Sequence, residues 1–453
     1  MVDVKADLED LQMEIIKQLP DLIENSKKKA LEFMNNGKVD FDREIILKGN
    51  IKGLNKLYTS DNIYAMKDLL DRGYKGKIDL IYIDPPFFTM ANYWHRISLG
   101  EKNIRYLAYN DIWKDGLLEY LEMLTVRLYL MKELLSSRGT IYVHLDYRTV
   151  HYVKIIMDCI FGRERFLNEI IWAYRSGGAS RRHFARKHDT ILAYTKTEEY
   201  IFNPQKEKSY NRGLKPYRFK GVKEYQDEIG WYTLVNLRDV WQVDMVGRTS
   251  KERIGYGTQK PEALLKLIIL SSSNEDSIVA DFFAGSGTTA AVAEKHKRNW
   301  VISDLEDIAV ATIRKRLSQV GKSSYQVLSK SQAKSKINFE IEREAKNQKE
   351  YLKFIFKEYK MDWEGVELKE EDREIIEEIL KKDSLSLIDY IGIGYKNNKG
   401  QNIIKKEIIR RRDDISSHYH VKYLLDEEFK GQVYIKFIDI FGRNFYEIRK
   451  INK

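Results

Sequence analysis

The sequence predicts an α/β fold, a mainly parallel sheet with helices on both faces. Short apolar runs at residues 80–83 and 277–280 each lead into an aspartate, Asp84 or Asp281, and a sharp turn. Uninterrupted β-prone runs of this length are typical of buried parallel strands. Helical patterns separate such runs along much of the chain, as in a doubly wound sheet. A chain of 453 residues is long enough for two or three domains.

The elements are expected in the following order. Residues 1–48 predict two polar amphipathic helices that break near Pro20, since proline disrupts a helix interior. Residues 49–196 and 257–328 are two α/β halves. The first half has expected strands at 56–59, 80–83, 140–145, 169–174 and 190–194 and helices at 65–70 and 117–135. The second has expected helices at 262–270 and 290–297 and strands at 277–281 and 300–303.

Two loops interrupt the first half. Residues 88–113 are expected to form a long aromatic loop, and long loops in compact domains are usually functional or disordered. The loop at 175–188 is basic, which predicts either a solvated surface or contacts to phosphates. Its arginines include Arg175, Arg181, Arg182 and Arg186.

The alternation of strands and helices stops in two further regions. Residues 197–256 mix aromatic residues with basic ones such as Lys215 and Arg218, which suits DNA contact and equally a solvated β-rich insert. Residues 329–453 predict a separate C-terminal α+β domain, with helices at 338–359 and 370–382 and a strand at 433–440. The arginine run at 410–412 predicts a solvated face or a phosphate contact.

The stretch Asp84-Pro85-Pro86-Phe87 directly follows the first apolar run. Two prolines cannot continue a central strand, so the chain must turn there. The turn places a carboxylate and an aromatic face at the carboxyl end of the sheet, where open α/β sheets bind ligands. By itself the stretch is equally consistent with a structural turn.

A second motif begins at Asp281, where a strand ends and Phe283, Gly285 and Gly287 precede an alanine-rich helix. Glycines let the backbone approach a ligand closely, and a helix N-terminus favours polar groups. The next strand ends in Asp304, placed to accept hydrogen bonds from ribose hydroxyls. This order of elements predicts a cofactor that contains adenosine.

A third motif, Thr258-Gln259-Lys260-Pro261, opens a helical pattern. Threonine and proline are ordinary residues at a helix start. Three of the chain's six prolines lie in this motif and the first, which favours a specific structural role for both.

Together these motifs resemble the S-adenosylmethionine-dependent amino-group DNA methyltransferases. The catalytic motif precedes the cofactor motif, which is the β-class order, and the likeness is greatest to modification subunits of type III restriction systems. It runs from about residue 55 to 317. The resemblance implies a permuted Rossmann-like methyltransferase sheet with residues 197–256 as an inserted target-recognition region.

The resemblance also implies roles for individual residues. Asp84, Pro85, Pro86 and Phe87 would act on the target base, and Phe283, Gly285, Gly287 and Asp304 would hold the cofactor. Asp61 would contact the cofactor adenine, Thr258 to Lys260 would close over its methionine, and Asp281 would fix the loop. Ser60 stands where the family often has glycine, which leaves the role of Asp61 less well defined.

The function implied is methylation of the N6 amine of adenine in double-stranded DNA. Aspartate in the first motif position is typical of the adenine enzymes, whereas N4-cytosine enzymes more often have serine. Cytosine methylation, a non-catalytic DNA-binding subunit and an RNA methyltransferase remain alternatives. A restriction subunit and a second copy of this chain are candidate partners.

Composition agrees with a polyanionic partner in a reducing compartment. The formal net charge is +10, which favours nucleic acid without proving it. The single cysteine, Cys159, sits in an apolar run and is expected to be buried; one cysteine cannot form an intramolecular disulfide, so a cytoplasmic location is expected. The histidines lack metal-site spacing, so no metal is expected, and no apolar run is long enough for a membrane span.

Overall fold

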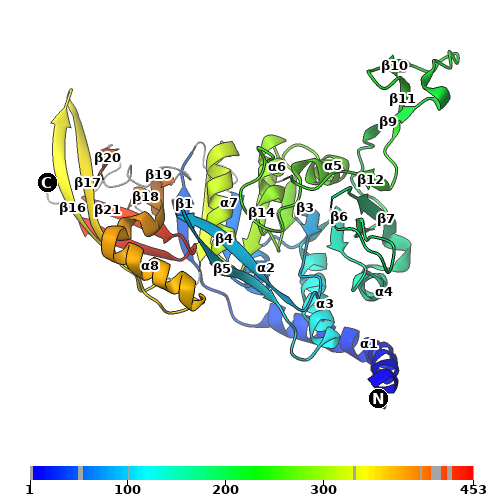
Figure 1. The fold of residues 1–453 in the computed structure, drawn as a ribbon, viewed down its shortest axis with the longest axis horizontal. Coiled ribbons are helices and arrows are strands. Elements are labelled where there is room, and N and C mark those ends of the chain that lie inside the picture. The colour runs from blue at the N-terminus through cyan, green and yellow to red at the C-terminus, as the bar shows by residue number, and fades with distance from the viewer. Residues whose placement is uncertain are drawn as a thin grey trace.

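The computed structural model describes residues 4–48, 55–99, 101–176, 178–247, 249–329, 333–397, 400–409, 420–425 and 431–451, so the arginine run at 410–412 lies outside it. A 14-stranded sheet runs through the molecule (Figure 1). Six neighbouring strands in its centre are parallel. In spatial order the strands are β12 (Val240–Gln242), β7 (Phe166–Ala173), β8 (His188–Thr195), β6 (Leu135–Leu145), β3 (Ile78–Ile83), β13 (Ile278–Asp281), β14 (Asn299–Asp304), β2 (Asn55–Thr59), β15 (Tyr325–Ser329), β1 (Asp42–Ile46), β19 (Asn402–Ile409), β18 (Ile388–Lys396), β21 (Gln432–Asp439) and β22 (Asn444–Lys450).

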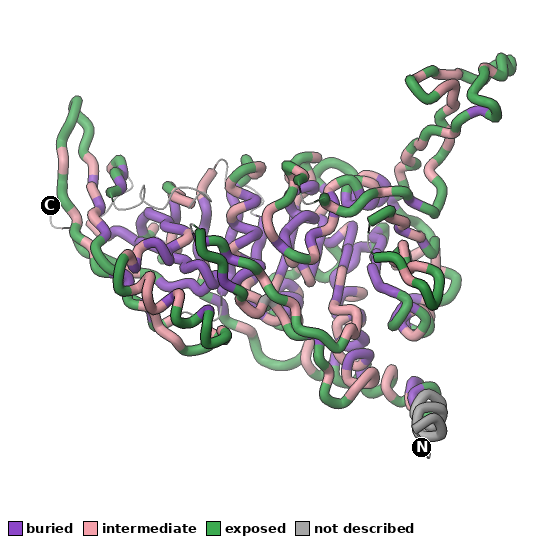
Figure 2. The backbone as a smooth tube through the Cα atoms, in the orientation of Figure 1, coloured by how far each residue is buried: buried purple, intermediate pink, exposed green. Residues whose placement is uncertain are grey.

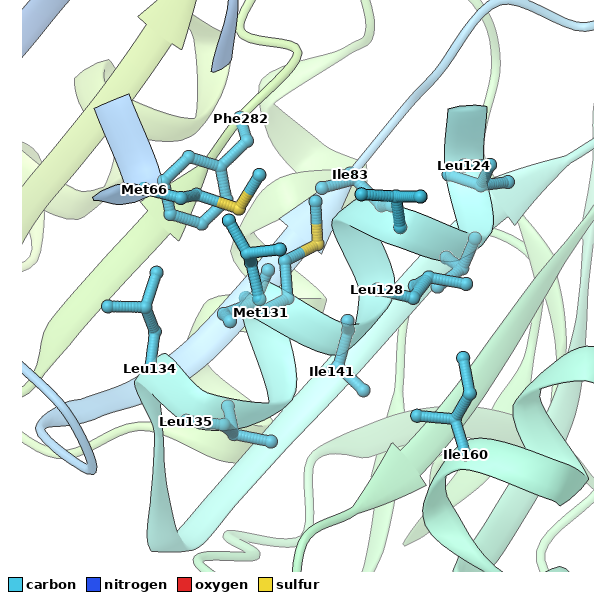
Figure 3. Packing of buried hydrophobic residues seen from close by; sticks show 14 of the residues in the cluster. Met66, Ile83, Leu124, Leu128, Met131, Leu134, Leu135, Ile141, Ile160 and Phe282 are labelled. Carbon is cyan, nitrogen blue, oxygen red and sulfur yellow. The ribbon is translucent and has the colours of Figure 1, made fainter. Parts of the chain in front are cut away.

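Helices cover both faces of the parallel region, which confirms the predicted fold class. Along β3, Ile81 and Ile83 belong to one hydrophobic cluster and Leu80 and Tyr82 to another, because successive side chains of a strand point to opposite faces. The first cluster, part of which Figure 3 shows, packs against α1 (Val4–Asn35), α2 (Asn62–Asp71), α3 (Leu117–Leu134) and α4 (Val150–Phe161). The second packs against α5 (Glu262–Ser272), α6 (Thr288–Lys295) and α7 (Asp307–Val320).

Strands β3 and β13 are parallel neighbours, with Leu80 opposite Val279. Their carboxyl ends therefore lie at one edge of the sheet, although about two hundred residues separate them along the chain. Asp84 follows β3 and Asp281 ends β13, so the Asp84–Phe87 motif and the glycine-containing motif that begins at Asp281 meet at this edge. Strand β14, which ends in Asp304, lies on the other side of β13.

The N-terminal prediction of two helices was wrong. Helix α1 continues through Pro20. Leu19 and Ala30, on either side of the proline, are both buried in the first cluster, and this packing offsets the lost backbone hydrogen bond. The segment after α1 also contains β1, which the sequence did not predict.

The aromatic segment at 88–113 is a β-hairpin rather than an irregular loop. Strands β4 (Ala91–Leu99) and β5 (Lys102–Asp111) pair only with each other and cross in front of the main sheet (Figure 1). The hairpin tip is anchored: Ile97, Leu99 and Ile104 belong to a third hydrophobic cluster built mainly by C-terminal residues.

The helix expected at 338–359 is also a hairpin, formed by β16 (Lys336–Lys346) and β17 (Lys349–Lys360), with β20 (His420–Leu424) beside β17. Burial alternates along β17: Leu352, Phe354 and Phe356 are buried and their neighbours less so. That period of two favours a strand despite a composition rich in lysine and glutamate. Helix α8 (Glu370–Asp383) confirms the other expected helix, and a 3₁₀ turn (Ser384–Leu387) follows it.

The C-terminal region, predicted as a separate domain, shares the main sheet with the rest of the chain. Strand β19 pairs with β1, so the main sheet continues across residue 329 into the C-terminal strands. Glu44 of β1 lies buried at this junction, where Arg314 of α7 and Lys436 of β21 both contact its carboxylate. The C-terminal region thus shares its sheet and its ion pairs with the rest of the chain.

Part of the 197–256 region projects as an arm, defined here as residues 206–236 (Figure 1). It holds a small sheet of β9 (Lys206–Tyr210), β10 (Glu224–Gln226) and β11 (Trp231–Asn236), with a 3₁₀ turn at Arg212–Leu214. Figure 2 shows the arm as largely exposed or half-buried. The chain then returns through β12 to the edge of the main sheet, beside β7.

Cys159 is exposed, not buried, because it lies on the outer side of α4, away from Ile156 and Ile160. No helix in the described ranges is long and apolar enough to cross a membrane. A 3₁₀ turn at Arg163–Arg165 links α4 to β7.

Candidate active site

A cavity of about 590 Å³ opens at the carboxyl ends of the central strands. Residues of all three sequence motifs line it, together with the β4–β5 hairpin. The motif residues in its wall are Asp61, Asp84, Pro85, Pro86, Phe87, Thr258, Gln259, Lys260, Asp281, Phe283, Gly285 and Asp304. The structure thus brings together every residue predicted to act on the base or hold the cofactor, with Gly287 directly beside the wall.

The Asp84 carboxylate presents two oxygens in different environments. Its Oδ2 accepts a hydrogen bond from the Lys260 ammonium, and both side chains are less than one-fifth exposed. Its Oδ1 is buried and has no hydrogen-bond partner in the described structure. A buried acceptor without a donor is costly. This oxygen is therefore suited to a donor that arrives with the substrate.

A buried polar network lies behind Asp84. His144 Nδ1 is 2.8 Å from the Tyr82 hydroxyl and 3.8 Å from Asp84 Oδ1, while His144 Nε2 is 3.3 Å from Asp189. The Tyr174 hydroxyl donates to Asp189 at 3.3 Å. Burial opposes ionisation of Asp189, but hydrogen bonding and charge from His144, with Lys260 nearby, hold its pKa below the usual value.

Phe87 presents an aromatic surface next to the carboxylate. Its ring centroid is 5.6 Å from that of His144 and 5.5 Å from the Lys260 Nζ. The Pro85-Pro86 turn holds the chain away from the sheet, so that Asp84 and Phe87 both reach the cavity. A flat apolar face beside an unpaired acceptor suits a planar heterocycle with an amino group.

The loop after β13 is held by Asp281. This carboxylate accepts hydrogen bonds from the Phe283 backbone at 3.0 Å and the Thr289 hydroxyl at 2.5 Å. Burial raises the pKa of Asp281 to about 7. Gly285 and Gly287 both have positive φ, and a Cβ on Gly287 would lie 2.9 Å from Ile313. The tight turn therefore requires glycine at Gly287 on steric as well as conformational grounds.

Asp304 faces the same loop from the end of β14. It accepts hydrogen bonds from the backbone N–H groups of Gly285 at 2.7 Å and Glu306 at 3.0 Å. Burial raises the pKa of Asp304. Burial and the neighbouring Asp304 and Asp307 carboxylates raise the pKa of Glu306, which also lines the cavity, to about 7.

Asp61 caps helix α2 by accepting from the Ile63 backbone at 3.0 Å. Arg127 of α3 donates to the same Asp61 oxygen at 2.8 Å and also contacts Asn62. Asp61 is thus fixed at the cavity wall by a cap and an ion pair. Sequence inspection missed Arg127, because nothing in the pattern of α3 distinguishes it from a surface arginine.

The Thr258-Gln259-Lys260 segment is tied to both halves of the site. Gln259 donates to the Glu252 carbonyl at 2.8 Å and accepts from the Ile254 N–H at 3.0 Å. The Lys260 carbonyl accepts from Thr288 at the start of α6. The sequence placed Lys260 with the cofactor, whereas the structure places its ammonium on Asp84.

Several other cavity residues were not foreseen. Tyr256 lies beside Gly285, and Tyr93 and Tyr109 of the hairpin stack with ring centroids 4.5 Å apart. His144 interrupts the apolar end of β6, a pattern that could have indicated it, whereas Asp189 lies among polar residues at the start of β8 and carries no such signal. No group of three metal-type ligands occurs within the described ranges.

The predicted DNA-contacting residues lie on two separate surfaces. The first is the loop at 175–188. There Arg175 forms an ion pair with Asp244 at 2.6 Å, and Arg186 stacks on Tyr147, which lies outside the loop. Arg181 and Arg182 are exposed in that loop. Lys215 and Arg218 are exposed on the arm, away from the cavity. None of these six side chains lines the cavity.

Comparison with known proteins identifies relatives over the region that builds the cavity. The family model N6_N4_Mtase, described as DNA methylase, matches residues 78–315. The type II methyltransferase M.EcaI of Enterobacter cloacae is 30% identical, over 58% of this chain and 69% of the relative. The DNA adenine methyltransferase YhdJ of Escherichia coli strain K12 is 28% identical, over 56% of this chain and 80% of the relative.

A solved structure, that of an M1.HpyAVI–SAM complex, is also similar. It is 21% identical, and the match covers 58% of this chain and 98% of that chain with a TM-score of 0.38. The two named relatives are a type II and an adenine methyltransferase, so the predicted likeness to type III modification subunits stays a prediction.

Proposed function

Because this chain belongs to the N6_N4_Mtase family of DNA methylases, we propose that it transfers a methyl group from S-adenosylmethionine to the N6 amine of adenine in double-stranded DNA. The observation that carries the proposal is the Asp84 carboxylate in the wall of the cavity that the glycine loop and Asp304 also line; its buried Oδ1 has no hydrogen-bond donor among the described residues. An amine entering this cavity meets an acceptor that no protein group satisfies.

The chemistry requires help because the exocyclic amine of adenine is a poor nucleophile, its lone pair being delocalised into the ring. Asp84 Oδ1 and the Pro85 carbonyl accept hydrogen bonds from the two amine hydrogens and direct the lone pair out of conjugation. Phe87 stacks on the base and fixes its plane. Positioning and electrostatics supply the rate enhancement, and no covalent adduct with the base is needed.

The residues opposite Asp84 fit the methyl donor. The turn at Gly285 brings the backbone to the cavity wall, and Asp304 beside it can accept hydrogen bonds from ribose hydroxyls. Phe283 and Asp61 also line this wall, and we assign Phe283 to the methionine end of the cofactor and Asp61 to its adenine. When bound, S-adenosylmethionine supplies the methyl group on a positively charged sulfur.

Two exposed basic surfaces are suited to the duplex. The loop between β7 and β8, with Arg181, Arg182 and Arg186, lies at the same edge of the sheet as the cavity and would contact the DNA backbone near the target. The arm carries Lys215, Arg218 and exposed aromatics such as Phe219, and we assign it to sequence recognition. The target base must leave the stack to reach Asp84.

Adenine is preferred over cytosine because aspartate opens the catalytic motif, and because the relative YhdJ is named as an adenine enzyme. We also propose the cytoplasm as the site of action. A restriction subunit or a second copy of this chain would be the protein partner, and light scattering of the purified protein, alone and with such a subunit, tests both.

The decisive experiment uses purified protein, tritiated S-adenosylmethionine and duplex DNA, followed by methylation-sensitive sequencing. We expect methyl groups at adenine in one sequence context. Asp84→Ala should abolish transfer while calorimetry still detects cofactor binding. Methylation at cytosine would correct the base assignment, and loss of cofactor binding in Asp84→Ala would place Asp84 in the wrong subsite.

A further inference from the structure

Phe184 is the most exposed large hydrophobic side chain in the described part of the molecule, with 99% of its surface accessible. It lies in the loop between β7 and β8. Exposing a whole phenyl ring to water is unfavourable, although single exposed apolar residues are common on protein surfaces. Its position and its neighbours therefore decide whether the exposure has a use.

The loop is attached to the rim of the catalytic cavity. Arg186, two residues after Phe184, donates to the Tyr147 hydroxyl at 2.7 Å, and its guanidinium lies 3.9 Å from the centroid of the Tyr147 ring. The two residues that flank Tyr147, Asp146 and Arg148, both line the cavity.

Chain length also limits how far Phe184 can be from the cavity. Asp189, which lines the cavity, is only five residues further along the chain. An extended chain spans at most about 3.6 Å per residue, so the two Cα atoms lie within about 18 Å. Phe184 is therefore kept near the residues that line the cavity.

The surroundings of Phe184 are basic. Arg181 and Arg182 are exposed, and no ion pair is found for either among the described residues, whereas Arg175 at the start of the loop is paired with Asp244. Unpaired guanidinium groups beside an aromatic side chain suit a surface that meets phosphates and bases together. A protein-binding hot spot would instead be expected to gather further apolar residues around the ring.

We propose that Phe184 inserts into the DNA duplex at the position that the target base vacates when it turns into the cavity. This inference rests on the proposed function. Extruding a base breaks its stacking and pairing, and an aromatic ring in the gap restores stacking for the neighbouring bases. The arginines hold the loop on the backbone, while Asp84 and Phe87 receive the extruded base.

The test compares Phe184→Ala with the unchanged protein on two duplexes. In one the target adenine is paired with thymine, and in the other it lies opposite an abasic site, where extrusion is easier. We expect methylation of the paired duplex to fall about 10- to 100-fold in the variant, the range of one to two lost stacking contacts. Methylation of the abasic duplex should stay within about twofold of the unchanged protein, since an easily extruded base needs no wedge.

A fluorescent base provides a second readout. 2-Aminopurine at the target position brightens when it leaves the stack; Phe184→Ala should lose this increase and Phe184→Trp should keep it. Ile155→Ala, which changes an exposed apolar residue of α4, is the matched control and should behave as the unchanged protein. Phe219→Ala on the arm should weaken binding of both duplexes equally.

The outcomes are distinct. Equal losses on the paired and abasic duplexes, or no loss on either, would overturn the role of Phe184. Failure of the unchanged protein to methylate any duplex would instead reject the proposed function, whatever Phe184 does.

Discussion

Lys260 and Asp84 belong to motifs 176 residues apart, yet their charged groups are in direct contact beside Phe87. The ammonium balances one oxygen of the carboxylate and fixes its orientation, while the other oxygen is left without a hydrogen-bond donor among the described residues. Removing one partner of a largely buried ion pair costs about 3–5 kcal/mol because the remaining charge is left uncompensated. Lys260 is therefore a positioning residue for the catalytic aspartate.

We expect Lys260→Met to lower the rate of methyl transfer by about 100-fold or more, while the dissociation constant for S-adenosylmethionine changes less than about threefold. Single-turnover kinetics and calorimetry provide the two measurements. Lys260→Arg keeps the charge and should recover part of the rate. If cofactor affinity fell together with the rate, Lys260 would instead act on the cofactor, as the sequence predicted.

Glu306 makes stability depend on pH near neutrality. Its folded pKa, raised by burial and by Asp304 and Asp307, is about 7, against an ordinary value of 4.5. An acid with a raised folded pKa contributes stability that is complete below the unfolded pKa and is lost as pH rises through the folded pKa. The loss for Glu306 therefore falls between about pH 4.5 and 7.

Glu306→Gln has no proton to release, so the melting temperature of this variant should fall less than that of the unchanged protein between about pH 5 and 8. Between these pH values the free energy of unfolding of the unchanged protein should fall by about 1–2 kcal/mol more than that of the variant, allowing for partial exposure of the side chain. Thermal melts without cofactor measure it. Asp281, whose pKa burial also raises to about 7, makes stability fall with pH in the same way. The buried Lys436, whose pKa burial lowers to about 7, makes stability rise with pH. Both groups are present in the variant and in the unchanged protein, so they do not affect the comparison. Identical pH profiles would show that Glu306 is ionised in the folded state already.

Among the elements, the β4–β5 hairpin connects the cavity to the C-terminal region. Tyr93 and Tyr109 line the cavity at its base, and Ile104 near its tip is fully buried in the C-terminal cluster. Lys102 at the tip also pairs with Glu378 of α8. Because the hairpin pairs with no described strand of the main sheet, the anchored tip is expected to help keep its tyrosines in place.

Ile104→Ala should therefore reduce cofactor affinity in addition to stability. Truncating a buried isoleucine costs about 2–5 kcal/mol. Ile376→Ala is the matched control, because Ile376 of α8 is equally buried in the same cluster but is not on the hairpin. Calorimetry at a temperature where both variants are folded should show weaker S-adenosylmethionine binding only in Ile104→Ala. Equal affinities would show that the hairpin is positioned without its anchor.

At the scale of the whole molecule, one sheet joins the N-terminal strand, the cavity and the C-terminal region. A chain that ends at Ser329 would lose β19, which covers the edge of β1, and would expose Ile97 and Ile104 of the hairpin. Glu44 would also lose Lys436 and Tyr434, which leaves Arg314 as its remaining partner at this junction. Exposed strand edges and apolar surface favour aggregation.

We expect the chain truncated at Ser329 to be destabilised and to bind S-adenosylmethionine weakly or not at all. Replacing the arm, residues 206–236, by a short flexible linker is the control, since the arm forms its own small sheet. That deletion should keep cofactor affinity and lose site selection. Circular dichroism, thermal melts and calorimetry compare the two. A truncated chain that folds and binds the cofactor fully would establish the C-terminal region as an independent domain.

The sequence by itself determined the central elements and the three motifs. Asp84, Asp281 and Asp304 follow apolar runs whose strand character is local, and proline and glycine mark the turns after them, so these positions could be read from neighbouring residues. The predicted α/β class and the helix at α5 were confirmed. Only tertiary structure decided the rest, because it depends on pairings between distant segments. The Lys260–Asp84 contact, the network around His144, the hairpin at 336–360 and the shared C-terminal sheet are all of this kind. In each case the local composition allowed more than one outcome, and burial against residues far away in the chain selected the one observed.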